Sequence, residues 1–234
     1  MALREDLQKE VTATFTGGKW DEEKALVVPG PEGLRLNSNH AKKLDSATVL
    51  YADIDSSTNM VDRFAWWFAA EVYKAYLRCA SQIIKHEGGV ITAYDGDRVM
   101  AIFKGDAPNT TAVRSALQIN WVIEEIVRPT IKAKYPTTNF TFNHVIGIDT
   151  SALHVARIGV HGDNDLVWVG RAANHAAKLC TLSERPLWIT ETVYNAMQDS
   201  VKLSNGVNMW EKRTWTAMGG KAIYRSAYRW WTLG

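Results

Sequence analysis

The sequence predicts an α+β fold in which a split βαβ (ferredoxin-like) arrangement forms a mostly antiparallel sheet with helices packed on one face. Three observations lead to this prediction. Short apolar runs rich in β-branched residues alternate with stretches whose apolar residues recur every three or four positions. An Asp-Gly turn separates two of these runs, which is typical of a hairpin. The predicted elements follow the order βαββαββ, with short elements trailing them.

The first half of the pattern rests on apolar runs for the strands and on apolar faces for the helices. The expected elements are a strand over residues 47–52, one long helix from residues 56–58 to the glycine pair at 88–89, a hairpin of strands over 90–94 and 99–103, and a helix over 110–127. Pro129 is expected to close that last helix, because a proline inside a helix lacks the amide hydrogen and crowds the preceding turn.

The second half predicts strands over 140–148, 154–160 and 166–169, a helix over 172–182, a strand over 187–190, a short helix from Glu191 and a strand-like tail over 210–231. Residues 1–46 differ from the rest, because a short polar helix is followed by a loop rich in glycine and proline. We therefore expect an N-terminal helix and arm over residues 1–46 and one catalytic domain over residues 47–234.

Composition excludes several classes of protein. The chain has 234 residues with 27 Lys+Arg and 25 Asp+Glu, a net charge of +2, so it predicts neither nucleic acid nor a membrane surface as a partner. The longest apolar run, residues 64–70, is far shorter than the roughly 20 residues of a membrane span. Cys79 and Cys180 lie far apart without metal-ligand spacing, so neither a disulfide framework nor a zinc site is expected.

Two aspartates carry the first prediction about chemistry. Asp53 ends a buried strand, and Asp97 sits at the tip of the predicted hairpin. If these strands are neighbours, the two carboxylates converge and need a cation between them. With the backbone carbonyl of Ile54 they would form an oxygen donor set that suits Mg²⁺ or Mn²⁺. The alternative is that Asp53 caps the helix and Asp97 is only a turn residue.

The helix start that follows Asp53 predicts a phosphate site. Ser56, Ser57 and Thr58 open the helix, and the free N–H groups of a first helical turn attract phosphate oxygens. Together with the carboxylates, these residues predict a site for a nucleoside triphosphate bound jointly with divalent metal.

Three segments in this order resemble the signature blocks of class III nucleotidyl cyclases. They are Ala-Asp-Ile at residues 52–54, the stretch from Gly-Gly at 88–89 to Phe103, and Asn-His-Ala-Ala-Lys at residues 174–178, and together they span residues 47–190. The resemblance implies that Asp53 and Asp97 hold two divalent ions. It also implies a homodimer with composite sites, in which one chain supplies the aspartates and its partner supplies the Asn block.

The third block departs from the family pattern at one position. Asn174 is in place, but Lys178 stands where the family has arginine. The resemblance gives Asn174 the role of orienting the ribose and Lys178 that of stabilising the pentavalent phosphorus. Lysine offers a point charge without the planar fork of arginine, so the role stays open while its geometry changes. An amide and a lysine on an ordinary amphipathic helix are the alternative.

The base-reading positions also depart from the family. Purine cyclases carry polar residues at the places held here by Ala93 and Val167, whose side chains form no hydrogen bonds. Tyr51 lies two residues before Asp53, so on a strand it projects to the same face as that carboxylate. Its hydroxyl is a candidate to recognise a pyrimidine or the ribose. A buried tyrosine bonded to a backbone carbonyl is the alternative.

These features resemble the stand-alone pyrimidine cyclases of the bacterial Pycsar anti-phage system. The resemblance implies a cytoplasmic homodimer that converts UTP to 3′,5′-cyclic UMP and pyrophosphate, with the product acting on a separate effector that has a cyclic-nucleotide-binding domain. Three alternatives remain: a cytidylate cyclase acting on CTP, a catalytically silent nucleotide-binding regulator, and, more weakly, a purine cyclase.

Tryptophan is unusually frequent, with ten residues. Most of them flank the cyclase motifs without lying in them. We therefore expect the tryptophans to serve packing and the dimer interface and to have no catalytic role.

Overall fold

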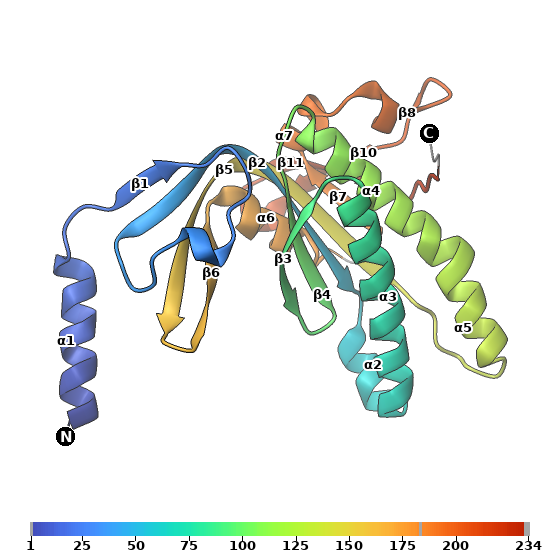
Figure 1. The fold of residues 1–234 in the computed structure, drawn as a ribbon. Coiled ribbons are helices and arrows are strands. Elements are labelled where there is room, and N and C mark those ends of the chain that lie inside the picture. Colours follow the sequence, from blue (N-terminus) through green and yellow to red (C-terminus); the bar gives the residue numbers. More distant parts are fainter. Residues whose placement is uncertain (1, 183, 232–234) are drawn as a thin grey trace. The chain divides into compact units, whose positions relative to one another are not determined.

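The computed structural model describes residues 2–182 and 184–231 (Figure 1). The chain divides into two compact units. One contains the residues up to Asp45 together with His154–Val169, and the other contains Ser46–Leu153 and the residues from Gly170 onward. Each unit is described by itself below.

The larger unit is built on the strands of one mixed sheet. Its strand order is β10-β11-β7-β5-β2-β4-β3. The strands are β2 (His40–Ile54), β3 (Val90–Asp95), β4 (Arg98–Phe103), β5 (His144–Val160), β7 (Leu187–Thr190), β10 (Glu211–Trp215) and β11 (Lys221–Ser226). The pairs β2–β4, β3–β4, β7–β11 and β10–β11 are antiparallel, whereas β5 and β7 are parallel. The predicted mostly antiparallel sheet and its hairpin are confirmed.

The helix expected after the first strand is interrupted. It forms α2 (Ser57–Arg63) and α3 (Trp66–His86), with Phe64 and Ala65 in extended conformation between them. No glycine or proline marks this break. The ring of Phe64 instead stacks on Phe68 at 4.9 Å and meets the edge of Phe140 at 5.5 Å. Burial of that ring in an aromatic cluster outweighs the local helical preference.

The prediction that Pro129 ends a helix is wrong. Helix α4 (Pro108–Val122) runs through a π-helical turn (Ile123–Val127) into α5 (Arg128–Lys134), and Pro129 lies in the first turn of α5. A π-helical turn spaces successive turns more widely, which makes room for the proline ring. The helical stretch therefore continues past the proline.

The two strands expected over 140–148 and 154–160 form one continuous strand, β5. The polar residues Asp149, Thr150 and Ser151 predict an interruption by their composition. In the structure Asp149 is fully buried and Thr150 nearly so, with partners on distant elements. Their satisfied side chains allow the strand to continue.

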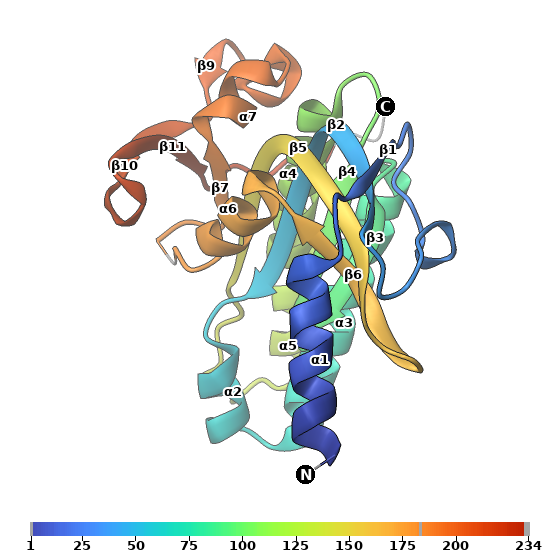
Figure 2. The ribbon, with the colours of Figure 1, turned by 90° about the vertical axis from the view of Figure 1, so that its left-hand side faces the viewer.

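The sheet of the larger unit is covered on both faces, in contrast to the single covered face that we expected. On β5, Ile146 and Ile148 join the main core with residues of α3 and α4, while Val145 faces a second cluster with Leu179. Leu179 belongs to α6 (Arg171–Leu179). Figure 2 shows α6 on the near side of β5 and β2, with α4 and α5 behind them.

The smaller unit contains α1 (Ala2–Thr16), none of whose residues is buried. Strand β1 (Asp21–Lys24) pairs in parallel with His40–Lys43, and β6 (Asp163–Val169) pairs with the end of β5 from His154 to Val160. The remaining elements of the chain are α7 (Glu191–Ala196), the strands β8 (Leu203–Ser204) and β9 (Val207–Asn208), and the 3₁₀ turns Pro31–Gly33, Asp199–Val201 and Thr216–Met218.

The tryptophans differ in burial. Trp188, Trp210 and Trp215 are buried and pack in the larger unit, as predicted, whereas Trp66 and Trp67 at the start of α3 are exposed. A role in a dimer interface stays a prediction. Among the helices that the structure describes, none is long and apolar enough to cross a membrane.

A substitution at Gly147 tests how closely β5 and α6 must pack. A Cβ at this position would overlap the carbonyl oxygen of Ala176 and lie 2.7 Å from Cβ of Leu179. Because the obstacle is helix backbone, we expect Gly147→Ala to lower the free energy of unfolding by about 3 kcal/mol. Urea denaturation measures the change. Gly33→Ala is the matched control, because its Cβ would meet only the flexible end of Lys42. Equal stability of the two variants would contradict the prediction.

Candidate active site

The structure brings Asp53 and Asp97 together. Strand β2 pairs with β4, with Ala52 opposite Val99. Asp53 follows that pair on β2, and Asp97 lies in the turn between β3 and β4, two residues before Val99. The expectation that the two strands are neighbours is confirmed. Asp97 lies close enough to Asp53 for its negative charge to raise the pKa of Asp53.

The electrostatics of this pair suit a cation. Burial raises the pKa of Asp53 to about 6, and the negative charge of Asp97 is the next cause. Oδ2 of Asp97 is buried and has no hydrogen-bond partner among the described residues. An anionic oxygen left without a partner beside a second carboxylate is what a divalent ion would satisfy.

The donor set is small. The described residues hold no cluster of three or more His, Cys, Asp or Glu side chains that would bind a metal. The donors that the sequence predicts are the two carboxylates and the backbone carbonyl of Ile54, at the end of β2. Such a set leaves coordination positions for substrate phosphates and water, as is usual for Mg²⁺.

Arg98 is a site residue that the sequence interpretation missed. Its guanidinium lies 5.3 Å from the ring centroid of Tyr51 and pairs with Asp95 at 2.6 Å. Its charge also lowers the pKa of Asp53, and its buried Nε has no hydrogen-bond partner among the described residues. The sequence feature that could have identified Arg98 is its position directly after Asp97, at the start of β4.

Tyr51 stands beside the carboxylates, as the alternation along β2 predicts. Burial raises the pKa of its phenol, so the hydroxyl stays protonated and is able to donate as well as accept. Its backbone oxygen accepts a hydrogen bond from the thiol of Cys180, at 3.4 Å. The second-face cluster that contains Leu179 and Trp188 packs against Tyr51, which places the ring on the α6 side of the sheet.

The predicted phosphate residues lie at the start of α2. Ser56 is the residue before the helix and has a left-handed backbone with φ of 62°. Its hydroxyl lies 3.1 Å from Oδ1 of Asp55 and caps no helical N–H. Asp55 and Ser56 line a cavity of about 280 Å³ with Asn59, Arg63 and Asn143. Ser57 and Thr58 form the first turn of α2.

Asn174 and Lys178 lie one turn apart on α6, as predicted, and both are exposed. Nζ of Lys178 approaches Sδ of Met218 at 3.6 Å, and this lysine forms no ion pair with any residue that the structure describes. No hydrogen bond or ion pair joins either side chain to Asp53 or Asp97 within the described chain. Among the described residues, the two aspartates and the Asn174–Lys178 pair thus share no direct polar contact.

The two positions that lack base-reading side chains belong to different units. Ala93 lies on β3 opposite Met100, where a register irregularity interrupts the pairing of β3 with β4. Val167 lies on β6 in the smaller unit, opposite Ala156. Its side chain is exposed.

The chain closely resembles curated proteins over nearly its whole length, although no protein-family model matches it. A protein of Burkholderia cepacia named uridylate cyclase is 56% identical over 230 residues, which cover 98% of this chain and 99% of the relative. A uridylate cyclase of Xanthomonas perforans is 49% identical over 230 residues, which also cover 98% of this chain and 99% of the relative. A uridylate cyclase of Rhodovulum sp. (strain MB263) is 35% identical, over 97% of each chain.

Solved structures agree on the fold. The adenylyl cyclase CyaB from P. aeruginosa aligns with a TM-score of 0.71 and 22% identity, over 83% of this chain and 99% of that one. The guanylate cyclase domain of RhGC from Catenaria anguillulae aligns with a TM-score of 0.63 and 18% identity, over 81% of this chain and 100% of that one. These similarities establish the class III cyclase fold. With the uridylate cyclase relatives, they show that the chain is a nucleotidyl cyclase and belongs to the family that contains those uridylate cyclases.

Proposed function

We propose that this nucleotidyl cyclase converts UTP to 3′,5′-cyclic UMP and pyrophosphate. The pairing of Asp53 with Asp97 beside the Tyr51 and Arg98 pair carries the proposal, because it combines a cation site with polar groups that a pyrimidine can contact. Relatives named uridylate cyclase support the same substrate.

Asp53 and Asp97, with the carbonyl of Ile54, would hold two Mn²⁺ or Mg²⁺ ions. When bound, such ions supply positive charge that lowers the pKa of a hydroxyl and neutralises phosphate oxygens. The unpartnered Oδ2 of Asp97 and the raised pKa of Asp53 support this assignment. Ser56, Ser57 and Thr58 would contact the phosphates of the substrate through the first turn of α2.

The reaction is an intramolecular substitution. The ribose 3′-oxygen forms a bond to the α-phosphorus, the bond from that phosphorus to the bridging β-oxygen breaks, and the 3′-hydroxyl proton is released. Asn174 would hold the ribose so that the attacking and leaving oxygens are in line. Lys178 would place its charge on the α-phosphate as negative charge builds up there. Both residues are exposed and free to meet a ligand.

The base would lie near Tyr51 and Arg98. Uracil presents two carbonyl oxygens and one N–H, which a guanidinium and a protonated phenol are able to complement. Ala93 offers a purine no hydrogen bond at the place where purine cyclases carry a polar side chain. Cytosine differs from uracil by an amino group in place of one carbonyl, so CTP is the alternative substrate. An Arg98 guanidinium, which only donates, favours the carbonyl of uracil.

We further propose that the enzyme acts as a homodimer with composite sites. The lack of a hydrogen bond or ion pair between Asn174 or Lys178 and the two carboxylates, among the described residues, supports this, since a second copy would bring the two groups together. A symmetric dimer would then hold two equivalent sites. The product would act on a separate cyclic-nucleotide-binding effector in the bacterial cytoplasm, as part of anti-phage defence.

A nucleotide-binding regulator without catalytic activity is a second candidate. Lys178 in place of the family arginine is the observation that favours it. The carboxylate pair opposes it, because an inactive protein gains nothing from two aspartates whose repulsion raises the pKa of Asp53.

Product analysis tests the substrate. Purified protein with Mn²⁺ and each of UTP, CTP, ATP and GTP in turn should yield cyclic UMP at least about tenfold faster than any other cyclic nucleotide, a margin that a site bonding to one base readily reaches. Chromatography with mass spectrometry identifies the product. Asp53→Ala and Asp97→Ala should show no turnover, whereas the control Asp62→Ala, on the exposed side of α2, should resemble the parent. Main formation of cyclic CMP, AMP or GMP would refute the uridylate assignment, and no cyclic product at all would favour the regulator.

Mixed dimers test the composite site. Asp53→Ala and Lys178→Ala chains should each be inactive alone. When they are co-expressed, about half of the dimers are mixed and each has one intact site, so about a quarter of the parental activity should return. Differently tagged chains allow the mixed dimer to be isolated. A mixed dimer that forms but remains inactive would contradict shared sites.

The charge of Asp53 should destabilise the metal-free protein. Its pKa rises on folding from 3.8 to about 6, so the folded state binds the proton more tightly and the penalty is absent below about pH 4 and complete above about pH 6. The shift corresponds to roughly 3 kcal/mol, of which we expect about 1–2 kcal/mol at this partly exposed group.

Asp53→Asn should therefore raise the melting temperature in EDTA at pH 7.5, and the gain should be much smaller at pH 4.5. Thermal unfolding measures both values, with the exposed Asp62→Asn as control. Adding Mn²⁺ should stabilise the parent but not Asp53→Asn. A lower melting temperature for Asp53→Asn at pH 7.5 without metal would show that the charge of Asp53 does not destabilise the metal-free protein.

A further inference from the structure

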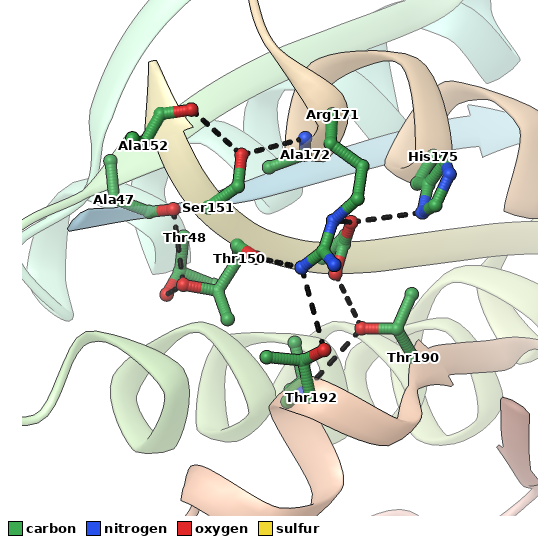
Figure 3. A network of polar contacts seen from close by, with 12 residues as sticks. Ala47, Thr48, Thr150, Ser151, Ala152, Arg171, Ala172, His175, Thr190 and Thr192 are labelled. Carbon is green, nitrogen blue, oxygen red and sulfur yellow. Dashed lines mark hydrogen bonds and ion pairs between the residues drawn. The ribbon is translucent and has the colours of Figure 1, made fainter. Parts of the chain in front are cut away.

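A buried polar network joins β5 to the start of α6 and to the end of β7. Its centre is Asp149, whose side chain is completely buried. A buried carboxylate is costly unless it is paired or hydrogen-bonded. Figure 3 shows that the partners come from elements far apart in the sequence, with Arg171 and His175 on α6 and Thr190 before α7.

Both oxygens of Asp149 have partners. Oδ1 accepts a hydrogen bond of 2.5 Å from the hydroxyl of Thr190. Oδ2 lies 3.2 Å from Nε of Arg171, as an ion-pair contact, and 3.1 Å from Nδ1 of His175, and neither contact has the alignment of a hydrogen bond. Nη2 of Arg171 also donates to the backbone oxygen of Thr150, at 2.6 Å. One carboxylate thus fixes two side chains of the same helix.

The first turn of α6 has a further attachment to β5. Gly170 precedes the helix and provides no side-chain cap. The hydroxyl of Ser151 accepts a 3.0 Å hydrogen bond from the N–H of Ala172, so the cap comes from the neighbouring strand (Figure 3). Near the other end of the helix, Gly147 leaves no room for even a Cβ beside Ala176. Polar contacts hold the start of α6, and close backbone contact holds its end.

These contacts determine the rotation of α6 about its axis. Arg171 and His175 are four residues apart and share the face that meets Asp149. Asn174 and Lys178 have the same spacing on an adjacent, exposed face. Because all four belong to one rigid nine-residue helix, a rotation that released Asp149 would also displace Asn174 and Lys178.

The protonation state of His175 allows its ring to act as a hydrogen-bond donor. Burial lowers its pKa, and the cations Lys221 and Arg171 act in the same direction against the opposing effect of Asp149. A neutral imidazole facing a carboxylate must carry its proton on Nδ1. The ring is held from the other side by Trp215, edge to face at 5.4 Å.

We propose that Asp149 and His175 are positioning residues that set the orientation of α6 and so place Asn174 and Lys178 for cyclisation. The inference rests on the roles given to Asn174 and Lys178 in the proposed function. Neither Asp149 nor His175 touches the substrate. Because the attack must be nearly in line, displacement of about 1 Å at Asn174 would cost up to about 100-fold in rate.

Steady-state kinetics of four variants test the proposal. Asp149→Asn places an amide donor against the two donors of α6, and His175→Leu removes the donor from the ring position. Both should lower kcat at least about tenfold while KM for the nucleotide changes less than about threefold, since the loss concerns geometry in the transition state. His175→Asn keeps a donor near the position of Nδ1 and should retain kcat within about threefold. Thr192→Ala, the control, removes only an exposed 3.4 Å contact to Arg171 and should match the parent.

Amide hydrogen exchange of residues 171–179 provides a readout that does not depend on activity. Exchange should be faster in Asp149→Asn and His175→Leu than in the parent and in Thr192→Ala. The proposal is overturned if folded His175→Leu turns over like the parent, if His175→Asn is as impaired as His175→Leu, or if exchange in α6 is unchanged. A parent that cyclises no nucleotide refutes the proposed function instead, and exchange then decides the positioning role alone.

Discussion

The burial of Asp53 beside a second carboxylate, Asp97, is the constraint on which the rest of the site depends. Burial raises the pKa of Asp53, and the negative charge of Asp97 raises it further, so the charged form of Asp53 is unfavourable without a cation. Arg98 relieves Asp53 only in part, because its closest anionic partner is Asp95. Such an arrangement persists only where the surrounding structure is rigid. Strand β2 provides that rigidity, since Leu50, Ala52 and Ile54 are buried in the main core.

Because helices cover both faces of the sheet, the residues of β2 that carry the predicted chemistry lie on the same face as helix α6. Residues of β2 alternate, so the buried positions that face α3 and α4 leave Tyr51 and Asp53 on the face that α6 covers. The thiol of Cys180, just after α6, bonds to the backbone of Tyr51. The helix that carries Asn174 and Lys178 is therefore attached to the strand that carries the carboxylate. Among the described residues the two groups nevertheless share no hydrogen bond or ion pair, which is why a second copy enters the proposal.

Sequence patterns predicted the structure correctly where it depends on residues that are close to one another in the chain. The convergence of Asp53 and Asp97 follows from a strand end and a hairpin turn, and the facing of Tyr51 follows from strand alternation. Features that depend on distant partners escaped prediction. The break at Phe64 accompanies an edge-to-face contact with Phe140, more than 70 positions away, and the helix beyond Pro129 requires a π-helical turn that no composition signal announces. Arg98 escaped because its contact with Tyr51 exists only once β4 lies beside β2.

The polar residues in the middle of β5 show what a failed structural prediction can reveal about the fold. Asp149, Thr150 and Ser151 favour a loop when each is considered alone, because unpaired polar groups do not belong in a buried strand. The strand continues because α6, the end of β7 and β2 bring polar partners to each of these side chains. A local pattern that contradicts the fold marks a place where tertiary contacts were strong enough to override it. Here those contacts hold the helix that carries Asn174 and Lys178, so the contradiction lies where the orientation of a functional helix is set.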